Sequence, residues 1–96
     1  MKLIVAMCST SRSDELHQVL LDLGVEGYTE IGALTGAGKT GRKLGTRMFP
    51  GTTTMTWTVV PDDRVDAIMS ALGALAERCY PAEGLHAFVL CIERAL

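Results

Sequence analysis

One segment of the chain combines glycines with clustered basic side chains and contains no acidic residue. Between residues 31 and 60 the sequence holds four of its nine basic residues, Lys39, Arg42, Lys43 and Arg47, whereas all eleven acids lie elsewhere. The whole chain has a net charge of -2, so this segment differs from the average surface. Clustered cations attract phosphates, carboxylates and other anions. We therefore expect an anion-binding segment; the alternative is a solvated loop that binds nothing.

Two glycines and a threonine complete the predicted ligand site. Gly36 and Gly38 allow the backbone to approach a ligand closely, and Lys39 and Arg42 can neutralise its charge. Thr40 follows Lys39 directly and is assigned to the same site. This run is not a P-loop, because alanine stands where that motif begins with glycine and no helical pattern follows.

Sulfur and imidazole side chains suggest a second chemistry, the binding of a metal ion. The candidate ligands are Cys8, Glu83, His86 and Cys91, and Cys8 and Cys91 are predicted to be neighbours across the sheet. Clustered histidines or acids, which zinc sites usually contain, do not accompany them. No metal is therefore assigned, and a solvated position at the end of a strand is the simpler interpretation of His86. Three cysteines without C-x-x-C spacing also fit a reducing compartment better than a disulfide framework.

Other functional classes find little support in the composition. No nucleophile and base stand at a suggestive spacing, so we do not expect an enzyme. The negative net charge and the 5% aromatic content disfavour nucleic-acid binding. No apolar run approaches the roughly 20 residues of a membrane span, and the first eight residues do not form a signal peptide. The sequence therefore predicts a cytoplasmic protein that does not insert into membranes.

Hydrophobic periodicity predicts four strands and two helices. Ser13 is expected to cap the first helix, which ends before Gly24 and carries His17 on its solvent side. Pro61 opens the second helix, and Pro81 prevents its continuation. The strands are expected at residues 3–8, 28–34, around 54–59, and 85–92. In the third strand, apolar residues alternate with three threonines, which indicates one buried face.

Strand–helix–strand order occurs twice, and it predicts a ferredoxin-like split βαβ fold of the α+β class (βαββαβ). An antiparallel four-stranded sheet would carry both helices on one face, in a single domain of residues 1–96 with a flexible loop at 36–50. The other face would be uncovered. A hydrophobic content of 48% in so short a chain favours covering it by self-association, with Met55 and Trp57 in the core or the interface.

These motifs, in this order, resemble those of the PII signalling proteins and their PII-like relatives. The most specific is VVPDDRVD at residues 59–66, which is similar to the family's VVPDDxVD. Supporting matches are MKLIVA at 1–6, LGVEGYT at 23–29, GAGKTG at 36–41 and Glu83-Gly84 before the last strand. The resemblance implies a ferredoxin-like homotrimer that binds an effector between subunits. The effector would be ATP, ADP, AMP or another small anion, with Glu83 and Gly84 in its site.

The segment after Gly36 is similar to the family's T-loop, which contacts partner proteins. The resemblance implies that Lys43, Arg47 and Phe49 contact a regulated membrane transporter or enzyme. Two departures matter: residues 78–85 contain one glycine and no lysine where the family has a glycine-rich phosphate loop, and the T-loop segment lacks tyrosine, which excludes tyrosine uridylylation. A PII-like relative is therefore favoured over a nitrogen-regulatory PII protein proper. The alternatives are a divalent-cation-tolerance-like metal-responsive module and a pure protein-interaction adaptor.

Overall fold

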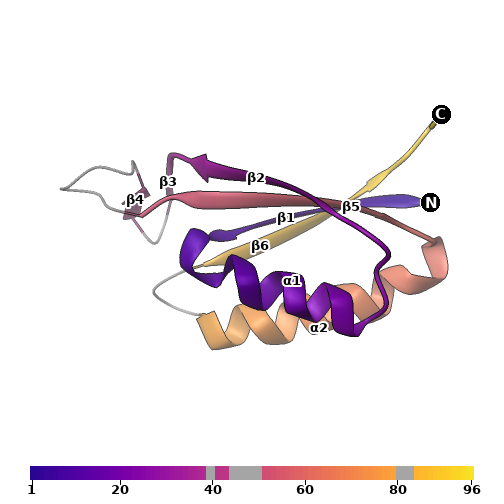
Figure 1. Cartoon of the computed structure of the whole chain (residues 1–96), viewed down its shortest axis with the longest axis horizontal. Coiled ribbons are helices and arrows are strands. Elements are labelled where there is room, and N and C mark those ends of the chain that lie inside the picture. Colours follow the sequence, from indigo (N-terminus) through magenta and orange to yellow (C-terminus); the bar gives the residue numbers. More distant parts are fainter. Residues whose placement is uncertain (39–40, 44–50, 80–83) are drawn as a thin grey trace.

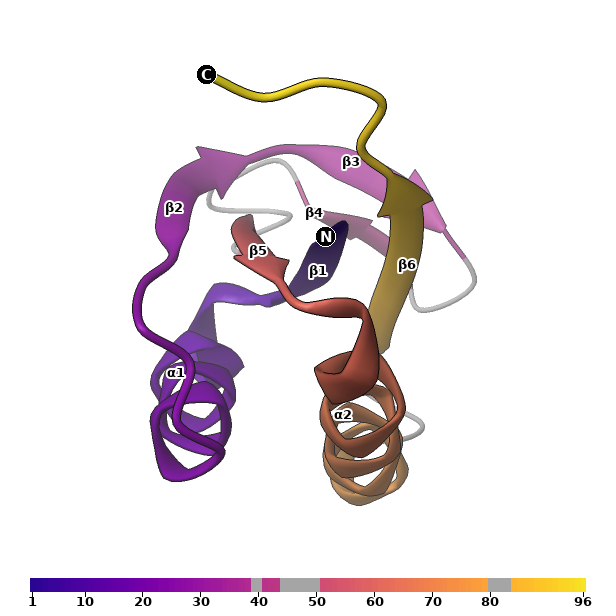
Figure 2. The ribbon, with the colours of Figure 1, turned by 90° about the vertical axis from the view of Figure 1, so that its right-hand side faces the viewer.

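The computed structural model describes residues 1–38, 41–43, 51–79 and 84–96, and it has the predicted α+β architecture. The main strands pair antiparallel in the order β2-β5-β1-β6, and both helices cover one face of this sheet (Figures 1 and 2). A separate hairpin, β3 with β4, follows β2. The bounds are β1 Lys2–Ser9, α1 Ser13–Asp22, β2 Thr29–Leu34, β3 Gly36–Gly38, β4 Gly41–Lys43, β5 Thr53–Val60, α2 Val65–Cys79 and β6 Leu85–Cys91.

Helix α1 ends as the sequence predicts but begins differently. Gly24 adopts φ 77°, its N–H donates to the Leu21 carbonyl at 3.0 Å, and Val25 N–H donates to the Leu20 carbonyl at 3.1 Å. This paired pattern is a Schellman motif, which favours glycine. The predicted cap at Ser13 is wrong, because a 3-10 turn at Thr10–Arg12 precedes the helix. Ser13 is already helical, and its hydroxyl donates backwards to the Thr10 carbonyl at 2.9 Å.

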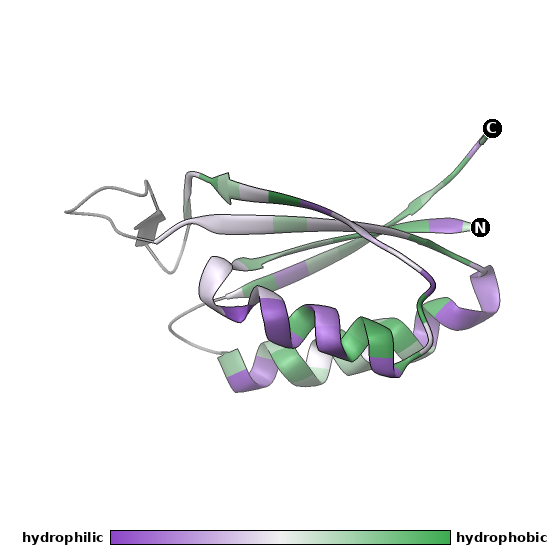
Figure 3. Cartoon of the chain, in the orientation of Figure 1, coloured by the Kyte–Doolittle hydropathy of each residue, from purple (hydrophilic) through white to green (hydrophobic). Residues whose placement is uncertain are grey.

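The core lies between the two helices and the sheet. Its largest fully buried apolar side chains are Ile4 on β1, Leu16 and Leu20 on α1, and Ile68, Leu72 and Leu75 on α2. The helical residues repeat at spacings of three and four, as expected for helices with one apolar side. Figure 3 shows the corresponding alternation of hydrophobic and hydrophilic residues along both helices. The predicted 3.6-residue periodicity therefore identified the core of the helical layer.

Strand β5 turns its threonines, not its largest apolar residues, toward the helices. Thr54, Thr56 and Thr58 are 0%, 2% and 3% exposed, whereas Trp57 and Val59 are 44% and 53% exposed. The alternation was predicted, but the face that the helices bury is the polar one. Each buried hydroxyl has a partner in another segment, so its burial leaves no donor or acceptor unpaired.

The opposite face of the sheet, here called the open face, is mainly apolar, and neither α1 nor α2 covers it (Figure 2). Strand pairing and side-chain alternation assign its members. They include Leu3, Val5 and Met7 on β1, Thr29 and Ile31 on β2, Met55, Trp57 and Val59 on β5, and His86, Phe88 and Leu90 on β6. Ile31, Phe88 and Leu90 are 41%, 51% and 46% exposed. The sequence predicted Trp57 in the core or in a subunit interface. It lies on the open face and not in the core, so the interface is the prediction that remains.

Candidate functional site

Four strand ends meet at one end of the sheet, here called the loop end. Cys8 near the end of β1 pairs with Thr54 at the start of β5 and with Leu85 at the start of β6, and Leu34 at the end of β2 pairs with Thr53. Strand β2 therefore ends, and strands β5 and β6 begin, at the same end of the sheet (Figure 1). This arrangement places the described residues of the predicted ligand site, Gly36–Gly38, Arg42 and Gly84, at one end of the domain.

The first part of the predicted loop is a short hairpin, which the sequence did not predict. Gly36 pairs with Lys43, Ala37 with Arg42, and Gly38 with Gly41. This register places the backbone of Arg42 and Lys43 directly beside β3. A Cβ built on Gly36 would meet nothing within 4 Å, so this backbone is open to a ligand.

Several predicted site residues lie outside the described residues. They are Lys39, Thr40 and Glu83 of the ligand site and Arg47 and Phe49 of the partner-binding segment. Of the remaining assigned residues, Gly36, Gly38, Arg42, Lys43 and Gly84 all belong to the loop end.

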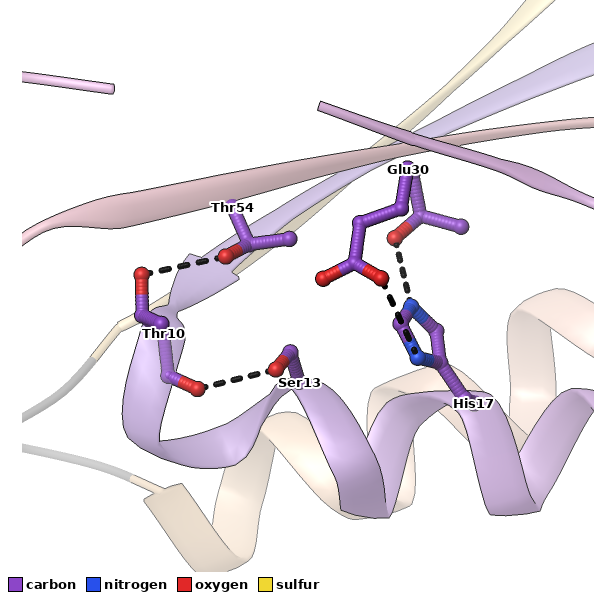
Figure 4. Close-up of polar contacts among 6 residues, drawn as sticks. Thr10, Ser13, His17, Glu30 and Thr54 are labelled. Carbon is purple, nitrogen blue, oxygen red and sulfur yellow. Dashed lines mark hydrogen bonds and ion pairs between the residues drawn. The ribbon is translucent and has the colours of Figure 1, made fainter. Parts of the chain in front are cut away.

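A cluster of hydroxyl groups supports the loop end and was missed by the sequence analysis. Thr10 forms hydrogen bonds through its side chain with Thr52 at 2.7 Å and Thr54 at 3.0 Å, and its N–H donates to the Thr52 carbonyl at 3.0 Å. Figure 4 shows Thr10 between Thr54 and Ser13. These contacts hold the start of β5 to the turn after β1. The signal was present as the run Ser9–Ser13 and three consecutive threonines, but their proximity depends on the strand order.

His17 is a second residue that the sequence analysis placed wrongly. His17 is 7% exposed, and its Nε2 lies 3.1 Å from the Thr56 hydroxyl (Figure 4). Tyr28 stacks on the ring with centroids 4.2 Å apart, and the Glu30 carboxylate lies 4.0 Å from Nδ1. His17 therefore joins α1 to β5 and to the beginning of β2. It follows Ser13 by one helical turn, which places it on the inward side of the helix.

The candidate metal ligands do not come together. Cys8 pairs with Leu85, but Cys91 pairs with Lys2 at the other end of the same strands, so the prediction that the two cysteines are neighbours is wrong. Six residues of extended strand separate them, or about 20 Å. His86 also alternates to the open face, whereas Cys8 faces the helices. Within the described part of the chain, no three histidine, cysteine or acidic side chains are grouped as a metal site requires.

The other end of the domain has a cleft of ≈ 270 Å³ between the end of α1 and the start of α2. Arg64 lines it and donates a hydrogen bond to the Leu23 carbonyl. Nearby, a hydrogen bond from the Met1 ammonium to the Asp62 carboxylate, at 2.7 Å, lowers the pKa of Asp62. None of the predicted ligand residues lines this cleft, so the loop end remains the candidate site.

Comparison with known proteins shows the family to which the chain belongs. The sequence matches the family described as "Nitrogen regulatory protein P-II" over residues 1–96, its whole length. The chain belongs to the P-II family. No curated protein matches it in sequence.

Solved structures of PII-like proteins share the fold of this P-II chain. The CPII protein of Thiomonas intermedia K12 bound to ADP, AMP and acetate has a TM-score of 0.76 at 23% identity, covering 99% of this chain and 88% of its own. The same protein bound to ADP and bicarbonate gives 0.71 at 22% identity, covering 93% and 86%. A putative PII-like signaling protein from Thermus thermophilus gives 0.67 at 23% identity, covering 92% and 82%. The ferredoxin-like PII arrangement is thus confirmed for this chain. No described helix has the length and apolar character needed to cross a bilayer.

Proposed function

We propose that this chain is a PII-like regulatory protein that binds a small anionic effector at the loop end. The effector is an adenine nucleotide or a small carboxylate-like anion such as bicarbonate. Membership of the P-II family supports the regulatory role, and the CPII structures contain ADP, AMP, acetate or bicarbonate. A regulatory role requires no catalytic group, in keeping with the sequence.

The observation that carries this proposal is that the β3–β4 hairpin and the start of β6 lie at the same end of the sheet, the loop end. Gly36 presents unobstructed backbone, and the β3–β4 register sets Arg42 and Lys43 beside it. Gly84 directly precedes β6, and Leu85, the first residue of β6, pairs with Cys8 at the same end. In our proposal Lys39 and Arg42 neutralise the effector, while Thr40, Glu83 and Gly84 border it.

The proposed assembly is a homotrimer formed through the open face. Exposed apolar side chains on β5 and β6, including Trp57, Val59 and Phe88, flank the half-buried residues of β1 and make a surface that a monomeric protein rarely exposes. The site would lie between subunits, and ordering of the segment that contains Lys43, Arg47 and Phe49 would change which transporter or enzyme the trimer engages.

Calorimetry and thermal shift with ADP, AMP, ATP, bicarbonate, acetate and divalent metals test the function. A ligand present at 100 times its dissociation constant raises the free energy of unfolding by about 2.7 kcal/mol. Stabilisation by a nucleotide or bicarbonate supports the proposal. A response to metals alone would instead support a metal-responsive module, and no response to any of these would leave a protein-interaction adaptor.

A further inference from the structure

One row across the open face holds two methionines and a histidine on three neighbouring strands. His86 on β6 pairs with Met7 on β1, and Met7 pairs on its other side with Met55 on β5. Paired residues of antiparallel strands point to the same face, and neighbouring strands lie about 4.8 Å apart. The three side chains are therefore direct neighbours, here called the methionine–histidine row.

The side chains of this row lie outside the core. Leu85 and Ala87, on either side of His86 in β6, pack against the core, whereas His86 is exposed. Met7 and Met55 are half-buried. Methionine has three rotatable side-chain bonds, so both sulfurs can turn toward a common point beside the imidazole. The row can therefore meet a ligand from the open side of the sheet.

The sulfur of Met55 already takes part in a polar contact on this face. The indole Nε1 of Trp57 donates a hydrogen bond to Met55 Sδ at 2.8 Å, and Trp57 is 44% exposed. A thioether sulfur has two lone pairs, so this contact leaves one of them for a metal ion. The indole ring also has a π face, which attracts cations within about 6 Å of its centre. Trp57 is thus placed to contact a cation that the row binds.

The donor atoms of the row suit a soft, singly charged metal ion. Thioether sulfur selects Cu(I), imidazole also binds copper, and both donors are uncharged. Strands β1, β5 and β6 contain no acidic residue, so these strands offer no carboxylate to a divalent ion such as Mg²⁺ or Ca²⁺. Zinc sites are built from thiolates, histidines and carboxylates, and not from thioethers. Three neutral donors with two sulfurs among them therefore favour Cu(I) over a divalent metal.

We propose that Met7, Met55 and His86 bind Cu(I) on the open face, with Trp57 beside the ion. Two sulfurs and one imidazole nitrogen form the site, and all of them come from a single chain. The site requires neither the anionic effector nor the homotrimer of the proposed function. Failure of either of those proposals would therefore leave this one standing, and the reverse also holds.

Titration of the full chain with Ag(I), a redox-stable substitute for Cu(I), tests the site. The parent protein carries Cys91→Ser, because Cys91 is an exposed free thiol that would itself bind soft metals, whereas Cys8 and Cys79 are buried. We expect one Ag(I) per chain and quenching of the fluorescence of Trp57, the one tryptophan in the sequence. Anaerobic competition with a Cu(I) chelator then measures the affinity for Cu(I). Zn²⁺ should bind more weakly than Ag(I).

Leucine variants identify the ligands, since leucine replaces methionine at little cost in packing. Met7→Leu, Met55→Leu and His86→Leu should each weaken binding at least about tenfold, because a lost ligand costs no less than a lost outer-shell partner. Met69→Leu is the matched control, because Met69 is a half-buried methionine of α2 that packs against the core. It should bind Ag(I) like the parent.

Weakening that is confined to the three row variants supports the site. Unchanged affinity in both Met7→Leu and Met55→Leu would overturn it, because the metal would then lie elsewhere. An equal loss in Met69→Leu, tighter binding of Zn²⁺ than of Ag(I), or no binding by the parent would each overturn it as well.

Discussion

Replacement of Trp57 by aspartate tests whether the open face holds subunits together. Trp57 is 44% exposed in the single chain. For a side chain of roughly 250 Å², this leaves about 110 Å² to be buried by a partner, or about 2.7 kcal/mol per subunit. An aspartate at the same place loses this contribution and adds the cost of burying a carboxylate. We therefore expect Trp57→Asp to abolish assembly.

Light scattering gives the result directly. The wild type should have about three times the 10.3 kDa chain mass, and Trp57→Asp should have the mass of one chain. Leu21→Asp is the matched control, since Leu21 is 54% exposed on α1, away from the open face, and its replacement should leave the mass unchanged. Far-UV circular dichroism checks that both variants stay folded. A folded Trp57→Asp protein that keeps the wild-type mass would refute the assignment of the interface.

Three further predictions concern the loop end and its support. Lys39→Ala combined with Arg42→Ala should weaken effector binding at least tenfold and flatten its salt dependence in calorimetry, because two charge-assisted contacts of roughly 1.5–3 kcal/mol each are lost. Gly36→Ala should leave the unfolding midpoint unchanged, since its Cβ meets no atom, yet reduce affinity if the ligand approaches that backbone; unchanged affinity would remove Gly36 from the site. His17→Phe and Thr56→Val should each lower the free energy of unfolding by about 1–3 kcal/mol and be coupled by at least ~0.5 kcal/mol in a double-mutant cycle of denaturation, whereas strict additivity would contradict their hydrogen bond.

The order of the elements could be predicted because its signals are local. Gly24 adopts the left-handed conformation that ends α1, and Pro61 precedes the turn that opens α2. Both effects arise within a few residues, so no tertiary information was needed. The β3–β4 hairpin was missed for the opposite reason, since three-residue strands rich in glycine carry no side-chain periodicity.

The orientation of β5 could not be predicted from its own alternation. A period of two separates Thr56 from Trp57 but does not state which of them faces the helices. The threonine face can be buried because its hydroxyls form hydrogen bonds with Thr10, His17 and the Gly27 carbonyl, which are distant in sequence. The threonine face of β5 and the polar residue His17 on α1 were both visible in the sequence, but their contact depends on the fold. For the same reason the sequence placed His17 on the solvent side of its helix.

The segment between β2 and β5 is attached to the sheet by more hydrogen bonds at its end than at its start. At its exit, Thr52 and Thr54 are joined to Thr10 by three hydrogen bonds of 2.7 to 3.0 Å. At its start, the pairing of β2 with β5 shifts register between Ile31 and Leu34, and Ala33 there has φ 57°. A non-glycine residue in this left-handed region is disfavoured by roughly 1–2 kcal/mol, and a bulge leaves a residue outside the ladder. The segment between β2 and β5 is thus joined to the sheet by an irregular strand, β2, and by a strand with several hydrogen bonds to the β1 turn, β5. Strand β2 is also the one that contacts α1, through Glu30 and His17.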